Sequence, residues 1–168
     1  MIQLQQVLDD WIVPAILFLP QELQFMARAQ MTLGIGVVET NYSDIVQVGG
    51  PALSFWQVEP STWEDLHQNF LVYRPDLTQS IQNCLNGEPE TVECLVDNPV
   101  YAALIASLIV YRAPPALPKY NDYEAQAYYW LTYYNAGGAG TMERAIPCFQ
   151  QVQGYTSPQL VMEKSNVS

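Results

Sequence analysis

The sequence contains few cationic and few metal-binding side chains. Its 168 residues include six lysines and arginines against 17 aspartates and glutamates, with one histidine, three cysteines and a formal net charge of −11. A chain this acidic does not attract nucleic acid or an anionic membrane surface through general electrostatics. Because the single histidine and the scattered cysteines are poor material for a zinc site, we expect no metal and no other cofactor. The cysteines are expected to be free thiols.

Long apolar runs are also missing. The stretch Trp11–Pro20 is interrupted by proline, and Pro99–Tyr111 is too short to span a bilayer. The first basic residue is Arg28, so the N-terminal stretch lacks the positive flank of a secretion signal. We therefore expect no membrane span and synthesis in the cytoplasm without a signal peptide.

The composition is that of a folded chain. Hydrophobic residues make up 49% and charged residues 14%, which excludes an intrinsically disordered protein, and the length fits one domain. Apolar residues recur mostly at helical spacing. The pattern predicts a mainly α-helical single domain over residues 1–153, a loop or short β segment near residues 41–59, and a mobile tail over residues 154–168. The predicted helices span Leu4–Leu19, Glu22–Val38, Ser61–Tyr73, Pro75–Leu85, Pro89–Val96, Asn98–Arg112, Asp122–Asn135 and Thr141–Phe149.

The candidate catalytic groups that remain are carboxylates. His67 lies in the middle of a predicted helix among polar neighbours, so we assign it no catalytic role. Glu39 directly follows the apolar segment Leu33–Val38, at the C-terminal end of a predicted helix. Apolar surroundings and the negative end of a helix both raise the pKa of a carboxyl group, as a general acid near neutral pH requires. The alternative is a capping glutamate that points into water.

Three separated segments form a pattern. They are Val38–Thr40, which reads VET, Gly50–Thr62, which reads GPALSFWQVEPST, and Tyr133–Gly140, which reads YYNAGGAG. In this order they resemble the lysozyme-like lytic transglycosylases, a superfamily that includes goose-type lysozymes. That family has a Glu-Ser at a helix end, a Gly-Leu-Met-Gln-x-x-Pro-x-Thr segment and an Ala-Tyr-Asn-x-Gly segment. The resemblance covers about Leu23–Ala145 and is closest to small versions carried by bacteriophages.

The resemblance implies a lysozyme-like fold and a role for Glu39 as the single catalytic acid and base. Glu39 would protonate the glycosidic oxygen between N-acetylmuramic acid and N-acetylglucosamine. In a lytic transglycosylase the same group then deprotonates the muramoyl 6-hydroxyl, which closes a 1,6-anhydro ring, whereas in a lysozyme water attacks. The residues implied in substrate binding are Thr40, Trp56, Gln57, Tyr134 and Asn135. The Tyr134 hydroxyl would hold the carboxyl group, and amides suit the acetamido groups of the sugar.

The sequence departs from the family pattern at several positions. Thr40 replaces serine, and Ser54 replaces a glycine, which predicts crowding where the backbone approaches the sugar. Glu59 and Asp44 are possible second carboxylates that would position a water and favour hydrolysis, or they are solvated side chains. Trp56 is either a wall of the cleft or a core residue.

The aromatic residues of the last helices allow two interpretations. Tyr134 shares a helix face with Trp130, so its ring is a candidate for the core while its hydroxyl reaches the cleft. Trp11 and Trp130 are expected in the core.

The resemblance implies a peptidoglycan-degrading lytic transglycosylase. Because peptidoglycan is anionic, a net charge of −11 disfavours a freely diffusing cell-wall enzyme. We therefore expect a virion component, associated with other tail or internal proteins of a phage particle and delivered by it to the periplasmic cell wall during genome entry. The alternative is a structural component of the virion that keeps the lysozyme-like fold with weak or lost activity.

Overall fold

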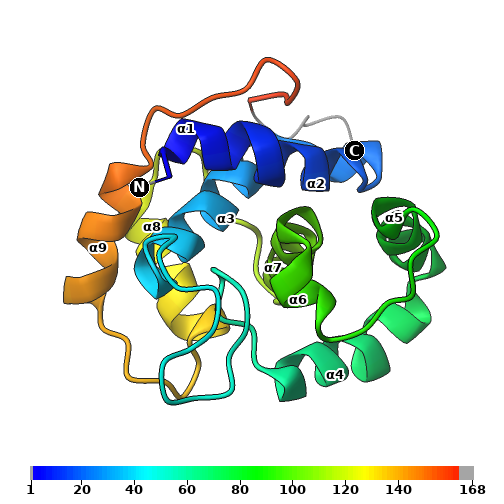
Figure 1. Cartoon of the computed structure of the whole chain (residues 1–168). Coiled ribbons are helices and arrows are strands. Elements are labelled where there is room, and N and C mark those ends of the chain that lie inside the picture. The colour runs from blue at the N-terminus through cyan, green and yellow to red at the C-terminus, as the bar shows by residue number, and fades with distance from the viewer. Residues whose placement is uncertain (1, 163–168) are drawn as a thin grey trace.

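Helices account for most of the chain in the computed structural model, which describes residues 2–162 (Figure 1). The mainly helical fold predicted from the sequence is therefore confirmed. The first helical rod consists of α1 (Leu4–Val7), the π-helical turn η1 (Leu8–Ile12) and α2 (Val13–Leu17). Pro14 has no N–H for an α-helical bond, and the wider turn of η1 lies directly before α2. The rod ends before Pro20, as predicted.

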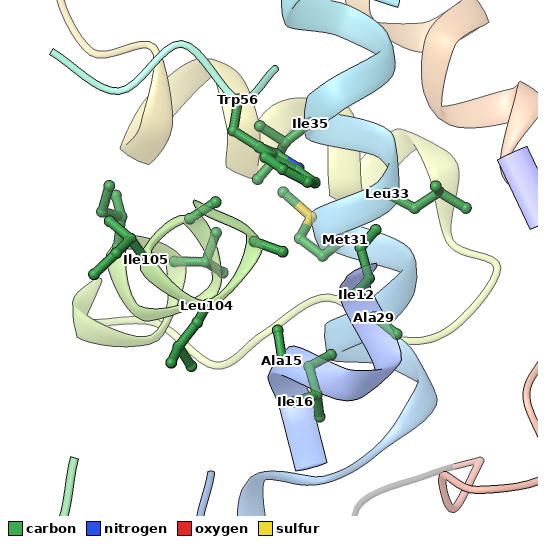
Figure 2. Packing of buried hydrophobic residues seen from close by; sticks show 14 of the residues in the cluster. Ile12, Ala15, Ile16, Ala29, Met31, Leu33, Ile35, Trp56, Leu104 and Ile105 are labelled. Atoms are coloured by element: carbon green, nitrogen blue, oxygen red, sulfur yellow. The ribbon is translucent and has the colours of Figure 1, made fainter. Parts of the chain in front are cut away.

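Two buried helices form the centre of the molecule. Helix α3 (Met26–Glu39) is buried from Met26 to Val38, and α7 (Pro99–Arg112) is buried from Tyr101 to Val110. A helix that is apolar on all sides is stable only inside a core. Figure 2 shows side chains of α3 packed between α7 and the first rod, with Trp56 covering one end of the cluster. The site described below lies at the C-terminal end of α3.

The other elements pack around this pair. Helix α9 lies against one side of α3 and α8 packs against α9, whereas α4 and α5 lie beyond α7 (Figure 1). The bounds of these elements, with the 3-10 turns η2 and η3 and the π-helical turn η4, are η2 Gln21–Leu23, α4 Pro60–Asn69, η3 Leu71–Tyr73, α5 Pro75–Leu85, α6 Cys94–Asp97, α8 Tyr123–Tyr129, η4 Trp130–Tyr134 and α9 Met142–Gln151.

The predicted boundaries need four corrections. The helix predicted as Ser61–Tyr73 ends at Asn69 and is followed by the separate turn η3. Helix α3 begins at Met26 because η2 precedes it and Phe25 is extended. Helix α6 covers only the end of the segment predicted as Pro89–Val96. The predicted helix Asp122–Asn135 is α-helical only as far as Tyr129 and then widens into η4. The loop near residues 41–59 has the predicted β character, in the form of isolated bridges that join Leu53 to Val46 and to Val58.

The mobile tail predicted from residue 154 is wrong for residues 154–162. Leu160 and Ser157 are buried, and the backbone N–H of Met26 donates to the Val161 carbonyl at 2.7 Å. The Tyr120 hydroxyl also donates to the Tyr155 carbonyl at 2.9 Å. The segment pairs with the extended backbone before α3, a long-range contact that local composition does not reveal. Residues 163–168 of the predicted tail lie outside the described residues.

Two further observations concern residues 2–162. Within this range, every helix is either too short or too polar to cross a membrane. In the same range, His, Cys, Asp and Glu side chains form no group of three or more that could hold a metal ion.

His67 belongs to a hydrogen-bonded cluster between α4 and α7. Its Nε2 lies 2.8 Å from Glu90 Oε2, and its Nδ1 lies 2.7 Å from the Trp63 carbonyl. Both neighbours are acceptors, so the protonated ring, with two donors, fits this position. Burial alone lowers the pKa of His67, but the bonds to Glu90 and Trp63 raise it overall. Burial alone raises the pKa of Glu90, but the bonds from His67 and from Tyr101, whose hydroxyl lies 2.6 Å away, lower it overall.

These shifts make stability depend on pH. The pKa of His67 is higher in the folded protein than in the unfolded chain, where it is about 6.5. The resulting stabilisation is complete at pH values below the unfolded pKa and is lost as the pH rises through the folded pKa. The lowered pKa of Glu90 stabilises the fold above its unfolded value, and that effect is lost as pH falls through the folded value. We therefore expect His67→Gln to reduce the free energy of unfolding more at about pH 6 than at about pH 9. Urea denaturation of both proteins checks this, and equal losses at the two pH values would contradict it.

Candidate functional site

A pocket of about 570 Å³ lies beside the C-terminal end of α3. This volume is in the range of small-ligand sites. Its walls come from the loop near residues 41–59, from the start of α4, from the glycine-rich loop after η4 and from α9. The polar side chains that line it are Glu39, Gln47, Gln57, Glu59, Thr62, Tyr134, Asn135 and Arg144. Four residues predicted from three separated segments, Glu39, Gln57, Tyr134 and Asn135, are therefore brought together.

The Glu39 carboxyl group is half-buried and accepts one hydrogen bond. The indole N–H of Trp130 donates to Glu39 Oε1 at 2.9 Å. Burial raises the pKa of Glu39, and this effect outweighs the Trp130 hydrogen bond and the positive charge of Arg144, which both lower it. The upward direction agrees with the expectation from the sequence. A carboxyl group of this kind can carry a proton at higher pH than an exposed glutamate, and can release it.

Two neighbours of Glu39 were not predicted as site residues. Trp130 is fully buried, as expected of a core residue, but its N–H reaches the carboxyl group. Arg144 in α9 donates from Nη2 to the Val38 carbonyl at 2.6 Å, and its guanidinium carbon lies 5.8 Å from the centre of the Trp130 ring. A cation at a helix C-terminus stabilises the helix. The sequence signal that could have identified Arg144 is the scarcity of cations in this chain.

The Tyr134 hydroxyl does not hold the Glu39 carboxyl group, which corrects the interpretation from the sequence. It donates instead to the Trp56 carbonyl at 2.6 Å. Burial, with the nearby charge of Glu39, raises the pKa of Tyr134 well above its usual value, so the hydroxyl keeps its proton. The residue therefore connects η4 to the loop that carries Gln57.

Asn135 brings an unpaired amide to the pocket. Its backbone N–H closes the π turn on the Trp130 carbonyl at 2.8 Å, while its side-chain Nδ2 is buried and has no hydrogen-bond partner among the described residues. Gly140 leaves the space for this amide, since a side chain at position 140 would collide with Asn135 Nδ2 and with the Trp130 ring. A buried amide donor without a partner is suited to a carbonyl oxygen of a ligand.

The loop near Gln57 has a strained but well-bonded backbone. Ser54 and Gln57 have positive φ angles of 71° and 51°. Gln57 Nε2 donates to the Ser54 carbonyl at 3.0 Å, which leaves its Oε1 as an acceptor. Ser54 is buried, accepts a bond from the Trp56 N–H at 3.2 Å, and does not line the pocket. The crowding predicted for Ser54 is therefore wrong, because its side chain turns into the loop.

Two other predicted binding residues have structural positions. Trp56 is fully buried and its indole N–H donates to the Thr32 carbonyl at 2.9 Å, so it is a core residue and not a wall of the cleft (Figure 2). Thr40 does not line the pocket, and its hydroxyl donates to the Phe55 carbonyl at 2.7 Å. It fastens the loop to the end of α3. The structure therefore places both side chains outside the lining of the pocket, in positions that support the loop, and their part in substrate binding stays a prediction.

The two candidate second carboxylates differ in position. Glu59 is exposed and lines the pocket. Asp44 is exposed, accepts a hydrogen bond from Ser43 at 3.0 Å, and does not line the pocket. Glu59 alone of the two is placed to act on a ligand beside Glu39.

Arg144 should control the protonation of Glu39. Its positive charge lowers the Glu39 pKa, so we expect Arg144→Met to raise that pKa further and extend the protonated form to higher pH. A carbon-13 NMR titration of the glutamate carboxyl groups measures this, with Glu39→Gln used to assign the signal. Arg112→Met is the matched control, because Arg112 pairs with Asp65 and does not line the pocket. A Glu39 pKa that stays the same or falls in Arg144→Met would contradict the assignment.

Comparison with known protein families, curated proteins and solved structures finds no match for this chain. The functional interpretation therefore depends on the pocket itself. The pocket combines one carboxyl group of raised pKa, Glu39, with two side-chain amides, Gln57 and Asn135, that have hydrogen-bonding atoms without a partner among the described residues.

Proposed function

We propose that this protein is a lytic transglycosylase that cleaves the β-1,4 bond between N-acetylmuramic acid and N-acetylglucosamine in peptidoglycan. The observation that supports this most is the convergence of Glu39, Gln57, Tyr134 and Asn135 on one pocket. These residues come from the three segments that resemble the lysozyme-like lytic transglycosylases. A chance similarity in three separated segments would not require them to meet in space.

In the first step Glu39 acts as general acid. The raised pKa favours the protonated form of its carboxyl group, and that proton passes to the glycosidic oxygen as the bond from that oxygen to muramoyl C1 breaks. The N-acetylglucosamine part leaves as an alcohol. Asn135 Nδ2 is a free donor for the acetamido carbonyl of the sugar, and Gln57 Oε1 is a free acceptor for an amide N–H.

In the second step Glu39, now a carboxylate, acts as base. It takes the proton of the muramoyl 6-hydroxyl while that oxygen attacks C1, which closes a 1,6-anhydro ring and returns Glu39 to its protonated form. The nucleophile is attached to the reacting sugar, so the reaction gains the advantage of an intramolecular attack and needs no residue to hold a water. A single carboxyl group is sufficient for the complete cycle.

The acidic character of the chain supports delivery by a phage particle. A net charge of −11 opposes free diffusion to an anionic wall, whereas transport with a virion supplies a high local concentration. We propose that the protein is associated with other virion proteins and acts on glycan strands at the periplasmic cell wall during genome entry.

Product analysis tests the proposed reaction. Purified peptidoglycan sacculi are incubated with the protein, and the released fragments are examined by mass spectrometry. We expect fragments that end in 1,6-anhydro-muramic acid, lighter by one water than lysozyme products. Hydrated reducing ends would identify a hydrolase and assign Glu59 as the base that positions water. Absence of products from a folded protein would contradict the proposed enzyme and favour a structural component of the virion.

A further inference from the structure

A second pocket, of about 800 Å³, lies between the start of α3 and the proline-rich connector that follows α7. It shares no lining residue with the pocket at Glu39. Most of its wall is apolar or aromatic, and Arg28 is the buried charged residue in it. The lining residues used below are Arg28, Tyr111, Ala116, Leu117, Tyr129 and Met162.

Arg28 is a buried cation without a carboxylate partner among the described residues. It is 3% exposed, and its Nε donates to the Leu23 carbonyl at 2.9 Å. Its guanidinium carbon lies 5.0 Å from the centre of the Phe25 ring and 5.2 Å from that of Tyr111. Its Nη1 is buried and makes no hydrogen bond within residues 2–162. The chain has 17 acidic residues, yet Arg28 forms no ion pair with any in the described range.

Nothing within residues 2–162 offsets the full cost of this arrangement. A buried charge is normally paired, and a buried donor normally has an acceptor. Burial lowers the pKa of Arg28 to about 10, an effect that Tyr111 and Tyr129 oppose only in part, so the group is still charged at neutral pH. The aromatic faces of Phe25 and Tyr111 offset part of the cost, but they do not satisfy the Nη1 donor.

We propose that this pocket binds a small organic carboxylate with an apolar body, its carboxylate against the Nη1 and Nη2 edge of Arg28. Nε is already occupied, and the remaining edge of a guanidinium presents two parallel donors that match the two oxygens of a carboxylate. One buried cation balances one negative charge, while exposed Lys119 and Glu22 on the wall offset each other. Leu117, Met162 and the rings of Tyr111 and Tyr129 supply the surface for the apolar part.

Titration with 3-phenylpropionate and its neutral amide tests the carboxylate preference. We expect saturable binding of the acid, detected by NMR shifts or calorimetry, and at least about tenfold weaker binding of 3-phenylpropionamide. Arg28→Met, which keeps the length of the side chain and removes the charge, should also weaken binding of the acid at least about tenfold. Glu39→Gln should leave it unchanged, so this result is independent of the proposed lytic activity.

A second variant keeps the test decisive if Arg28→Met does not fold. Ala116 is exposed on the wall of the pocket, and Ala116→Glu places a competing carboxylate there without changing Arg28. We expect it to weaken binding of 3-phenylpropionate severalfold, whereas Val72→Glu, at a site 64% exposed and outside both pockets, should not.

Four results would overturn the proposal. They are absence of saturation at about 10 mM acid, equal binding of acid and amide, tighter binding of phenyl phosphate than of 3-phenylpropionate, and binding that occurs only in Glu163→Gln. The last result would show that the carboxylate of Glu163 competes with the added acid for Arg28.

Discussion

Replacing Glu39 by glutamine is expected to reduce the release of fragments from peptidoglycan sacculi by about 10²-fold or more. The substitution keeps the shape of the side chain and removes the proton that the proposed mechanism transfers twice. Trp130 can still donate its indole N–H to the glutamine carbonyl, so the local structure should be retained. Because the raised pKa of Glu39 comes mainly from burial, an exposed carboxylate elsewhere in the pocket cannot replace it.

Glu59→Gln is the matched control for this experiment. Glu59 lines the same pocket and undergoes the same chemical change, but it is exposed and has no part in the two proton transfers. We expect it to keep most of the lytic activity, with circular dichroism and thermal melting showing that both variants are folded. A folded Glu39→Gln protein that lyses sacculi at the unchanged rate would remove Glu39 from the mechanism.

Substituting Gly36 by alanine is expected to destabilise the fold by about 3 kcal/mol, although alanine is the better helix former by about 1 kcal/mol. A Cβ at position 36 would collide with the ring and hydroxyl of Tyr42. Tyr42 is 5% exposed, donates to the Leu33 carbonyl at 2.9 Å, and packs edge-on to Trp56 at 5.6 Å between ring centres. Displacing it would break this hydrogen bond and disturb packing next to the last turn of α3.

A double-mutant cycle identifies the cause. If the collision with Tyr42 is responsible, Gly36→Ala should cost much less in a Tyr42→Leu background, because the smaller side chain leaves space for the methyl group. Urea denaturation of the four proteins gives the free energies of unfolding. An unchanged or increased stability in Gly36→Ala alone, or equal losses in both backgrounds, would be inconsistent with this contact.

Local patterns in the sequence were enough to predict most of the helices and to select Glu39. Helical periodicity depends on neighbours three and four residues apart. Helices α3 and α7 are buried on nearly all sides, so the length of their apolar segments indicates a helix more than periodicity does. Glu39 could be selected because the apolar segment before it already implies burial. Gln57 and Asn135 could be selected only through the resemblance in their segments.

The remaining features depend on long-range geometry. Trp56 belongs to the motif that gives Gln57, but adjacent residues in this loop point in different directions, and nothing local shows which side chain enters the core. Trp130 is predicted to be a core residue and lies in the core. Its hydrogen bond to Glu39 joins residues 91 positions apart, which the sequence does not reveal. Arg144 reaches Val38 across 106 positions. Such long-range contacts produce no repeating pattern in the amino-acid sequence.

The π turn η4 determines the directions in which the side chains of Trp130 and Asn135 point beside Glu39. In a regular α-helix, residues five apart point about 140° away from each other. The bond from the Asn135 N–H to the Trp130 carbonyl spans five residues, so this turn places Asn135 nearly above Trp130. If Trp130–Asn135 formed a regular α-helix, the Asn135 side chain would point about 140° away from Trp130, although every side chain of the pocket would still be present in the sequence. The arrangement of this site therefore depends on the width of one helical turn as well as on the residue types that line the pocket.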